Sequence, residues 1–183
     1  MSVQSIPASD LRHGDVLLYE HKRNQSLFVR GIRLITGSKF SHVGIVQDVS
    51  YTKLILEQLS EREYSDFHFY KPDVGEVIHI VRPRFPVPPT DSRLINHQGY
   101  GHWGIVDCLI NHALGRLLFG KWTYRPMLSL LKPDNIICSA LVATVLRLNF
   151  SAPWCSYLQV VEPDDYYNHA ETFQYLGIVD WAA

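Results

Sequence analysis

The sequence of 183 residues has no long apolar run, few cysteines and almost no net charge. No window reaches the ~18 consecutive apolar residues that a membrane-spanning helix needs, because Arg, His or Gly interrupts each apolar stretch. Basic residues number 17 and acidic residues 18, so a formal charge of -1 gives no general attraction to nucleic acid or anionic membranes. Residues 1–7 lack a basic segment followed by an apolar stretch, so no secretory signal is readable and we expect a cytoplasmic protein.

Metal and cofactor motifs are also scarce. The three cysteines, Cys108, Cys138 and Cys155, form no CxxC pair, which argues against a disulfide framework or a zinc knuckle. Four polar residues recur at intervals of five: His97, His102, Asp107 and His112. On a helix this interval scatters side chains, whereas zinc-binding helices use pairs spaced by four, so we expect no metal. The absence of a Gly-rich phosphate loop leaves no support for a nucleotide cofactor.

The apolar pattern predicts one α+β domain over residues 1–183, with a small antiparallel sheet packed against helices. Hydrophobic residues make up 46% of the chain, which is enough for a core. Strand-like runs cover residues 15–19, 41–47, 53–59, 76–81 and 173–179. Helical spacing covers residues 26–36, 106–118 and a segment after 133–135 that carries 138–146. The Pro-rich stretch 82–89 separates a strand-rich first half from a helix-rich second half.

One histidine and one carboxylate are predicted to meet across a hairpin. His42 lies in the apolar run Ser-His-Val-Gly-Ile-Val, and Glu57 lies near the end of the next run. If the two runs pair about residues 49–51, position 42 lies opposite 57–59, and Glu57 can reach His42. A carboxylate beside an imidazole fixes its tautomer and stabilises the imidazolium. Taken singly, a strand histidine is more often a core residue and a lone Glu more often an exposed strand end.

Cys138 is the cysteine best placed for chemistry. It falls in the first turn of an apolar helix, where free N–H groups and the helix dipole stabilise an anion and favour a lowered thiol pKa. Core packing is the commoner role of a free cysteine on a helix. Cys108 lies on an apolar helix face and Cys155 has no identifiable base, so both rank behind Cys138 as nucleophile.

Four fragments together resemble a known family. They are Leu-Arg-His-Gly-Asp-Val-Leu-Leu at 11–18, Ser-His-Val-Gly-Ile-Val at 41–46, Leu-Glu at 56–57 and Cys-Ser-Ala-Leu-Val at 138–142. In this order they resemble the circularly permuted papain-like hydrolases of the NlpC type, which are related to lecithin:retinol acyltransferase and include YiiX-like and YebB-like proteins. In that group a strand-borne histidine precedes a helix-borne cysteine, as it does here.

The resemblance implies a permuted papain-like fold and a cysteine hydrolase without a cofactor. Cys138 would be the nucleophile, His42 the general base and Glu57 the residue that orients the imidazole. An amidase or endopeptidase acting on peptidoglycan-type peptides is the first expectation for the substrate. A thioesterase, phospholipase or acyltransferase acting on lipid is the related alternative, and a binding module without turnover is the alternative from another class.

Overall fold

The computed structural model describes residues 4–21, 30, 33, 38–49, 52–58, 62–66, 75–88, 138–146 and 163–182. Seven strands lie within these ranges: β1 (Ser5–Pro7), β2 (Val16–His21), β3 (His42–Val49), β4 (Thr52–Gln58), β5 (Arg62–Asp66), β6 (Glu76–Pro83) and β7 (Phe173–Asp180). The helices given bounds there are the short 3-10 helix η1 (Ala8–Asp10) and the α-helices α3 (Cys138–Val145) and α4 (Pro163–Asn168).

The strands form one sheet in the order β1-β7-β6-β2-β3-β4-β5. The α+β class is therefore confirmed, but the sheet is mixed, not purely antiparallel, because β1 pairs with β7 in parallel. The parallel direction of β1 is possible because of the connection between β1 and β2. η1 leads the chain from β1 to β2, which lies three places away in the sheet, so no tight hairpin imposes an antiparallel direction on β1.

The predicted strands are confirmed with shifts at their ends. The apolar runs at 15–19, 41–47, 53–59, 76–81 and 173–179 correspond to β2, β3, β4, β6 and β7. The segment that carries 138–146 contains α3, which begins at Cys138. In the predicted helix 26–36, Arg30 and Arg33 are helical, and the rest of that range and the helix 106–118 lie outside the described residues.

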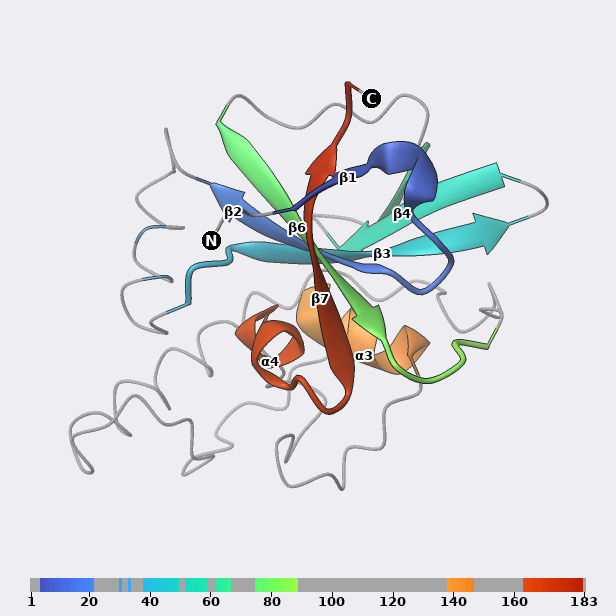
Figure 1. Cartoon of the computed structure of the whole chain (residues 1–183). Coiled ribbons are helices and arrows are strands. Elements are labelled where there is room, and N and C mark those ends of the chain that lie inside the picture. Colours follow the sequence, from blue (N-terminus) through green and yellow to red (C-terminus); the bar gives the residue numbers. More distant parts are fainter. Residues whose placement is uncertain are drawn as a thin grey trace.

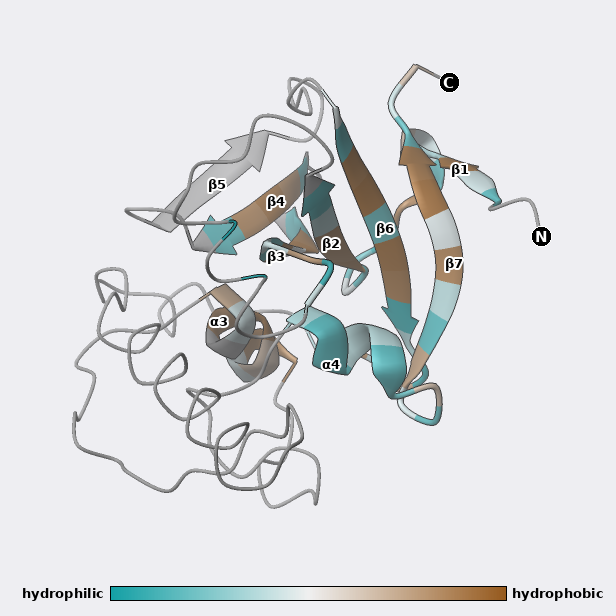
Figure 2. Ribbon diagram, turned by 90° about the vertical axis from the view of Figure 1, so that its left-hand side faces the viewer, coloured by the Kyte–Doolittle hydropathy of each residue, from teal (hydrophilic) through white to brown (hydrophobic). Residues whose placement is uncertain are grey.

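Both faces of the sheet are buried, and β2 lies at its centre. Figure 1 shows α3 and α4 on the same side of the sheet, and Figure 2 shows apolar residues along β4 and β6. On the helical side, Val16 and Leu18 of β2 share a core cluster with Val43 and with α3. On the opposite side, Leu17 and Tyr19 pack with residues of η1, β4 and β6. The alternating residues of β2 therefore supply both cores, which explains why its first four residues, Val16 to Tyr19, are all hydrophobic.

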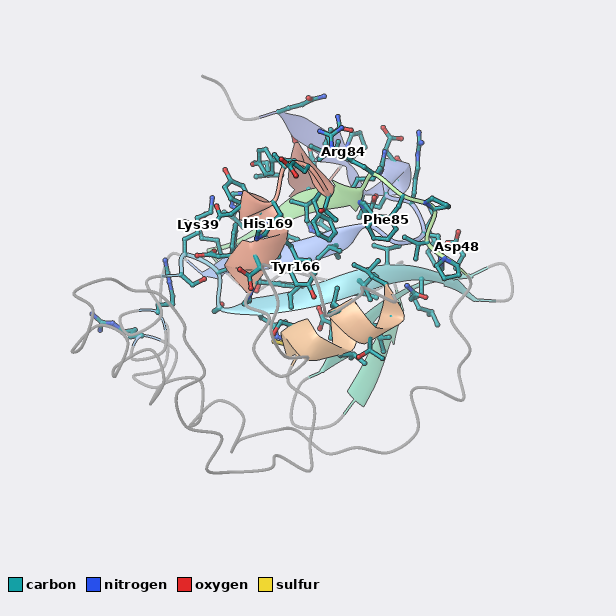
Figure 3. The ribbon with its side chains drawn as sticks, turned by 90° about the horizontal axis from the view of Figure 1, so that it is seen from below. Lys39, Asp48, Arg84, Phe85, Tyr166 and His169 are labelled. Carbon is teal, nitrogen blue, oxygen red and sulfur yellow. The ribbon has the colours of Figure 1, made fainter. Side chains whose placement is uncertain are left out.

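Two buried contacts fix α3 and α4 on the helical side. The hydroxyl of Tyr166 in α4 donates to the Ser139 carbonyl at 2.6 Å, and Figure 3 shows Tyr166 where the two helices lie side by side. Tyr166 also packs edge-on against Phe173 at the start of β7, with ring centroids 5.3 Å apart. Because Ser139 follows Cys138, these contacts hold the first turn of α3 in place. Within the described part of the chain, no helix is long and apolar enough to cross a membrane.

A buried ion pair fixes the start of β2. Asp15 is fully buried, and its carboxylate accepts hydrogen bonds from Nε and Nη2 of Arg82, both at 2.7 Å, and from the Arg12 N–H at 2.8 Å. The hydrogen bond from Arg82 to Asp15 raises the pKa of the guanidinium above its ordinary value. Gly14, immediately before, has φ 86°, which a residue with a side chain rarely adopts. Gly14 and Asp15 thus serve as the turn and anchor that start β2.

We expect Asp15→Ala to lower the free energy of unfolding by about 3 kcal/mol, the low end of the range for breaking a buried pair, because Arg82 retains contact with water. Urea unfolding followed by circular dichroism measures the change. Arg84→Ala is the matched control, since Arg84 is exposed and donates from Nε to the Ala170 carbonyl. A loss for Asp15→Ala no larger than the loss for this control would contradict the assigned role.

Candidate active site

His42 and Glu57 lie on one face of the β3–β4 hairpin. The register pairs Gly44 of β3 with Glu57 of β4, so the two strands form the hairpin that the sequence predicts. Side chains two residues apart on a strand share a face, which places Glu57 on the face of His42 and Gly44. His42 Nε2 lies 4.0 Å from Glu57 Oε2, and the side chains are 15% and 5% exposed. The predicted approach of this carboxylate to this imidazole is confirmed.

Tyr19 completes this group, and the sequence reasoning missed it. It is the register partner of His42 on β2, and its ring lies 5.1 Å from the imidazole at an interplanar angle of 50°. Its hydroxyl donates a hydrogen bond to Glu57 Oε1. The available signal was local: Tyr19 is an aromatic residue with a polar tip that directly follows the aliphatic run Val-Leu-Leu.

Gly44 provides the room for this contact. A Cβ placed on Gly44 would lie 3.0 Å from Glu57 Cγ, and 3.2 Å from both Glu57 Oε1 and the Tyr19 hydroxyl. Such distances are shorter than ordinary van der Waals contact, so a side chain at this position would displace the carboxylate, the hydroxyl or both. The glycine in Ser-His-Val-Gly is therefore required by close packing, since the hydrogen bond passes beside its bare Cα.

Cys138 approaches the same end of β3 from the helical side. Backbone hydrogen bonds from Val43, Ser139 and Cys138 itself reach the thiol sulfur. Val43 directly follows His42 on β3. Cys138 belongs to the core cluster on the face that carries Val43, whereas His42 alternates to the other face with Tyr19. The structure thus places the Glu57 carboxylate 4.0 Å from the His42 imidazole, and places the Cys138 sulfur beside the backbone of the residue that follows His42.

Burial decides the ionisation of the thiol. Cys138 is 8% exposed, and this burial is the largest cause that raises its pKa to about 11, with a smaller contribution from the negative charge of Glu57. The three N–H groups act in the opposite direction without overcoming it. The prediction of a lowered pKa at the helix N-terminus is therefore wrong for this structure, because desolvation of the thiolate exceeds the stabilisation by the backbone.

Other sequence candidates are not placed by the structure. Cys108, Cys155, His97, His102, Asp107 and His112 lie outside the described residues. Within the described ranges, no group of three or more His, Cys, Asp or Glu side chains is arranged to hold a metal ion.

Comparisons with known proteins gave a likeness to solved structures. No protein-family model matches the chain, and no curated protein matches it. A solved structure described as the metalloprotein yiiX from Escherichia coli O157:H7, DUF1105, has 15% sequence identity and a TM-score of 0.47. The match covers 93% of this chain and 98% of that chain. A TM-score of this size does not establish a shared fold.

We expect Gly44→Ala to destabilise the protein by about 1–3 kcal/mol, the usual cost of overpacking. Thermal or urea unfolding measures this loss. The matched background is Glu57→Ala, which removes the Cγ and carboxylate that the new methyl group would meet. In the Glu57→Ala background, Gly44→Ala should lower the free energy of unfolding by less than it does in wild type. An equal loss in both backgrounds would rule out the proposed close contact.

We expect the alkylation rate of Cys138 to rise with pH to a midpoint near 11 in the folded protein, since the raised pKa leaves little thiolate at neutral pH. In urea the midpoint should fall to about 8.5, the value of a solvated thiol. Peptide mapping by mass spectrometry separates the Cys138 adduct from those of the two other cysteines. A folded-state midpoint at or below the urea value would show that the buried environment does not control the thiol.

Proposed function

We propose that the protein is a cysteine hydrolase that cleaves amide bonds through an acyl-enzyme on Cys138. In this proposal the fold is of the permuted papain-like, NlpC-type group, His42 is the general base and Glu57 orients the imidazole. The observation that carries it is the arrangement at the start of β3, where Nε2 of His42 lies 4.0 Å from the Glu57 carboxylate and the N–H of Val43 faces the Cys138 sulfur. A nucleophile, a base and an orienting carboxylate are the parts that covalent acyl transfer needs.

The first half-reaction starts from a neutral thiol. Because burial raises the pKa of Cys138 to about 11, the sulfur carries its proton at neutral pH and needs a base as it attacks. His42 takes the thiol proton while a bond forms between sulfur and the substrate carbonyl carbon. Glu57 approaches Nε2, so Nδ1 is the nitrogen assigned to this proton transfer. The imidazolium then protonates the amine as the carbon–nitrogen bond breaks, which leaves a thioester on Cys138.

The second half-reaction returns the site to its starting state. His42 takes a proton from water, whose oxygen attacks the thioester carbon. As the carbon–sulfur bond breaks, the imidazolium returns this proton to the sulfur, which releases a carboxylic acid and leaves the neutral thiol and the neutral imidazole. The N–H groups of Cys138 and Ser139, which lie at the start of α3 and face the sulfur, are the candidates to stabilise the oxyanion in both halves. These N–H groups are fixed because Tyr166 holds the Ser139 carbonyl.

The substrate class follows from the sequence resemblance. Peptide amides of the peptidoglycan type are proposed first because the four matching fragments resemble the NlpC type. Lipid esters are the competing class, since the same thioester chemistry serves both.

We expect incubation with muropeptides to give an acyl adduct on Cys138, detected by mass spectrometry, and cleaved peptide products. Cys138→Ser should lose the adduct, and His42→Ala should lower the rate by about 10²–10⁴-fold, the usual contribution of a general base. Phospholipid vesicles are tested in parallel. An adduct from vesicles alone would replace the amide substrate with a lipid, and tight retention of muropeptides without adduct or products would show a binding module.

The alkylation profile gives a second control that needs no substrate. In wild type and in His42→Ala the thiol midpoint should stay far above about 8.5, since burial and not the histidine sets it. A midpoint near about 8.5 in both proteins would mean an ordinary solvated thiol and would contradict the catalytic role.

A further inference from the structure

In the described part of the chain, two groups of one tyrosine, one histidine and one glutamate differ in which side chains are hydrogen-bonded to each other. In the first, the Tyr19 hydroxyl donates to the Glu57 carboxylate, and Nε2 of His42 lies 4.0 Å from the other carboxylate oxygen. The second group, here called the His79 cluster, consists of Glu20, His79 and Tyr175. In it the carboxylate lies 2.8 Å from His79 Nε2, and the Tyr175 hydroxyl lies 3.0 Å from Nδ1.

The separation of His42 from its carboxylate has a visible cause. A charge-assisted hydrogen bond between nitrogen and oxygen is about 2.7–2.9 Å long, as in the His79 cluster, and 4.0 Å is well beyond it. One oxygen of Glu57 is occupied by the Tyr19 hydroxyl. Tyr19 and Glu57 are 2% and 4% exposed, so little water is available to replace this hydrogen bond. The tyrosine therefore restrains the carboxylate.

We propose that Tyr19 is a positioning residue whose hydroxyl holds Glu57 back from His42, so that the imidazole stays neutral until it accepts the proton of Cys138. This inference rests on the proposed function. A carboxylate in direct contact with an imidazole favours the charged imidazolium, which has no lone pair left to accept a proton. A carboxylate held a short distance away still stabilises the imidazolium once it forms.

The protonated state of the Cys138 thiol also requires that His42 be neutral before the reaction. With its pKa raised to about 11, Cys138 keeps its proton at rest, so the site needs a neutral base and not a preformed thiolate–imidazolium pair. Among the titratable groups that the described elements bring to this end of β3 are Tyr19 from β2, Glu57 from β4 and Cys138 from α3. Lys39 and Glu20 are the charged residues next along the chain to this group. In this proposal the carboxylate of Glu57 is the ionised group, so its position controls the charge of His42.

The test is the titration of His42 by NMR in protein labelled with carbon-13 at histidine. In Tyr19→Phe the ring remains and the hydroxyl is lost, so Glu57 is released to bond to His42. We expect the His42 midpoint to rise by about one pH unit, the effect of a hydrogen bond to a charged group. In Glu57→Gln the midpoint should fall, and adding Tyr19→Phe to Glu57→Gln should change it no further.

Tyr175→Phe is the matched control, because it removes a tyrosine hydroxyl beside a histidine on the other side of the sheet. It should leave the His42 midpoint unchanged. An unchanged or lowered midpoint in Tyr19→Phe overturns the inference. Should Tyr19→Phe fail to fold, the carbon-13 resonance of Tyr19 Cζ decides. It should move between wild type and Glu57→Gln, and an unmoved resonance overturns the inference.

Activity gives an independent readout. If muropeptides are cleaved, the acid limb of the rate profile should move upward in Tyr19→Phe by the same amount as the His42 midpoint, so the variant loses more activity at pH 6 than at pH 8. A raised midpoint without any cleavage by wild type would leave the restraint intact and refute the proposed function. Cleavage by wild type with an unchanged acid limb in Tyr19→Phe would support the proposed function and refute the restraint of Glu57 by Tyr19.

Discussion

The antiparallel register of β3 between β2 and β4 is the constraint on which the candidate site depends. It pairs Tyr19 with His42 and Gly44 with Glu57, which turns all four residues to one face. A slip of one residue in either pairing would turn the slipped strand's polar groups to the other face, into an apolar core. That slip is opposed because Val16 and Leu18 of β2 and Val43 of β3 bury their side chains on the other side. The apolar core thus specifies the geometry of the polar site.

The same core explains the state of the cysteine. α3 packs its apolar face on β3, and Cys138, at the first position of the helix, is drawn into the cluster with Val43. The first turn of a helix offers N–H groups to an anion, and here three backbone N–H groups do face the sulfur. Their stabilisation is local, whereas the loss of hydration affects the whole thiolate. A helix terminus therefore lowers a thiol pKa only where the sulfur also keeps contact with water.

The sequence was sufficient for elements whose signal is local. Alternating and continuous apolar runs identified five of the strands, and the short β3–β4 hairpin allowed Glu57 to be paired with His42. Contacts between distant segments could not be predicted in this way. Tyr19 and Glu57 are 38 residues apart, and their contact depends on a sheet order in which β2 neighbours β3. Asp15 and Arg82 are 67 residues apart and meet because β6 pairs with β2. The hydrophobic pattern of a single strand shows neither its place in the sheet nor the strands with which it pairs.

Tyr19 and Glu20 are adjacent in the sequence, yet they enter two polar groups of different chemistry because successive strand residues face opposite sides of the sheet. In the His79 cluster both ring nitrogens are engaged, one by the carboxylate and one by the tyrosine. The carboxylate only accepts, so Nε2 of His79 donates to Glu20, and the Tyr175 hydroxyl lies 3.0 Å from Nδ1. That histidine is tied to the sheet by two hydrogen bonds, which is a structural arrangement. Around His42 the tyrosine hydroxyl binds the carboxylate and not the ring. The same three residue types can therefore either hold an imidazole by both nitrogens or leave one nitrogen available for proton transfer. Which of these occurs depends on whether the tyrosine hydroxyl is hydrogen-bonded to the ring or to the carboxylate.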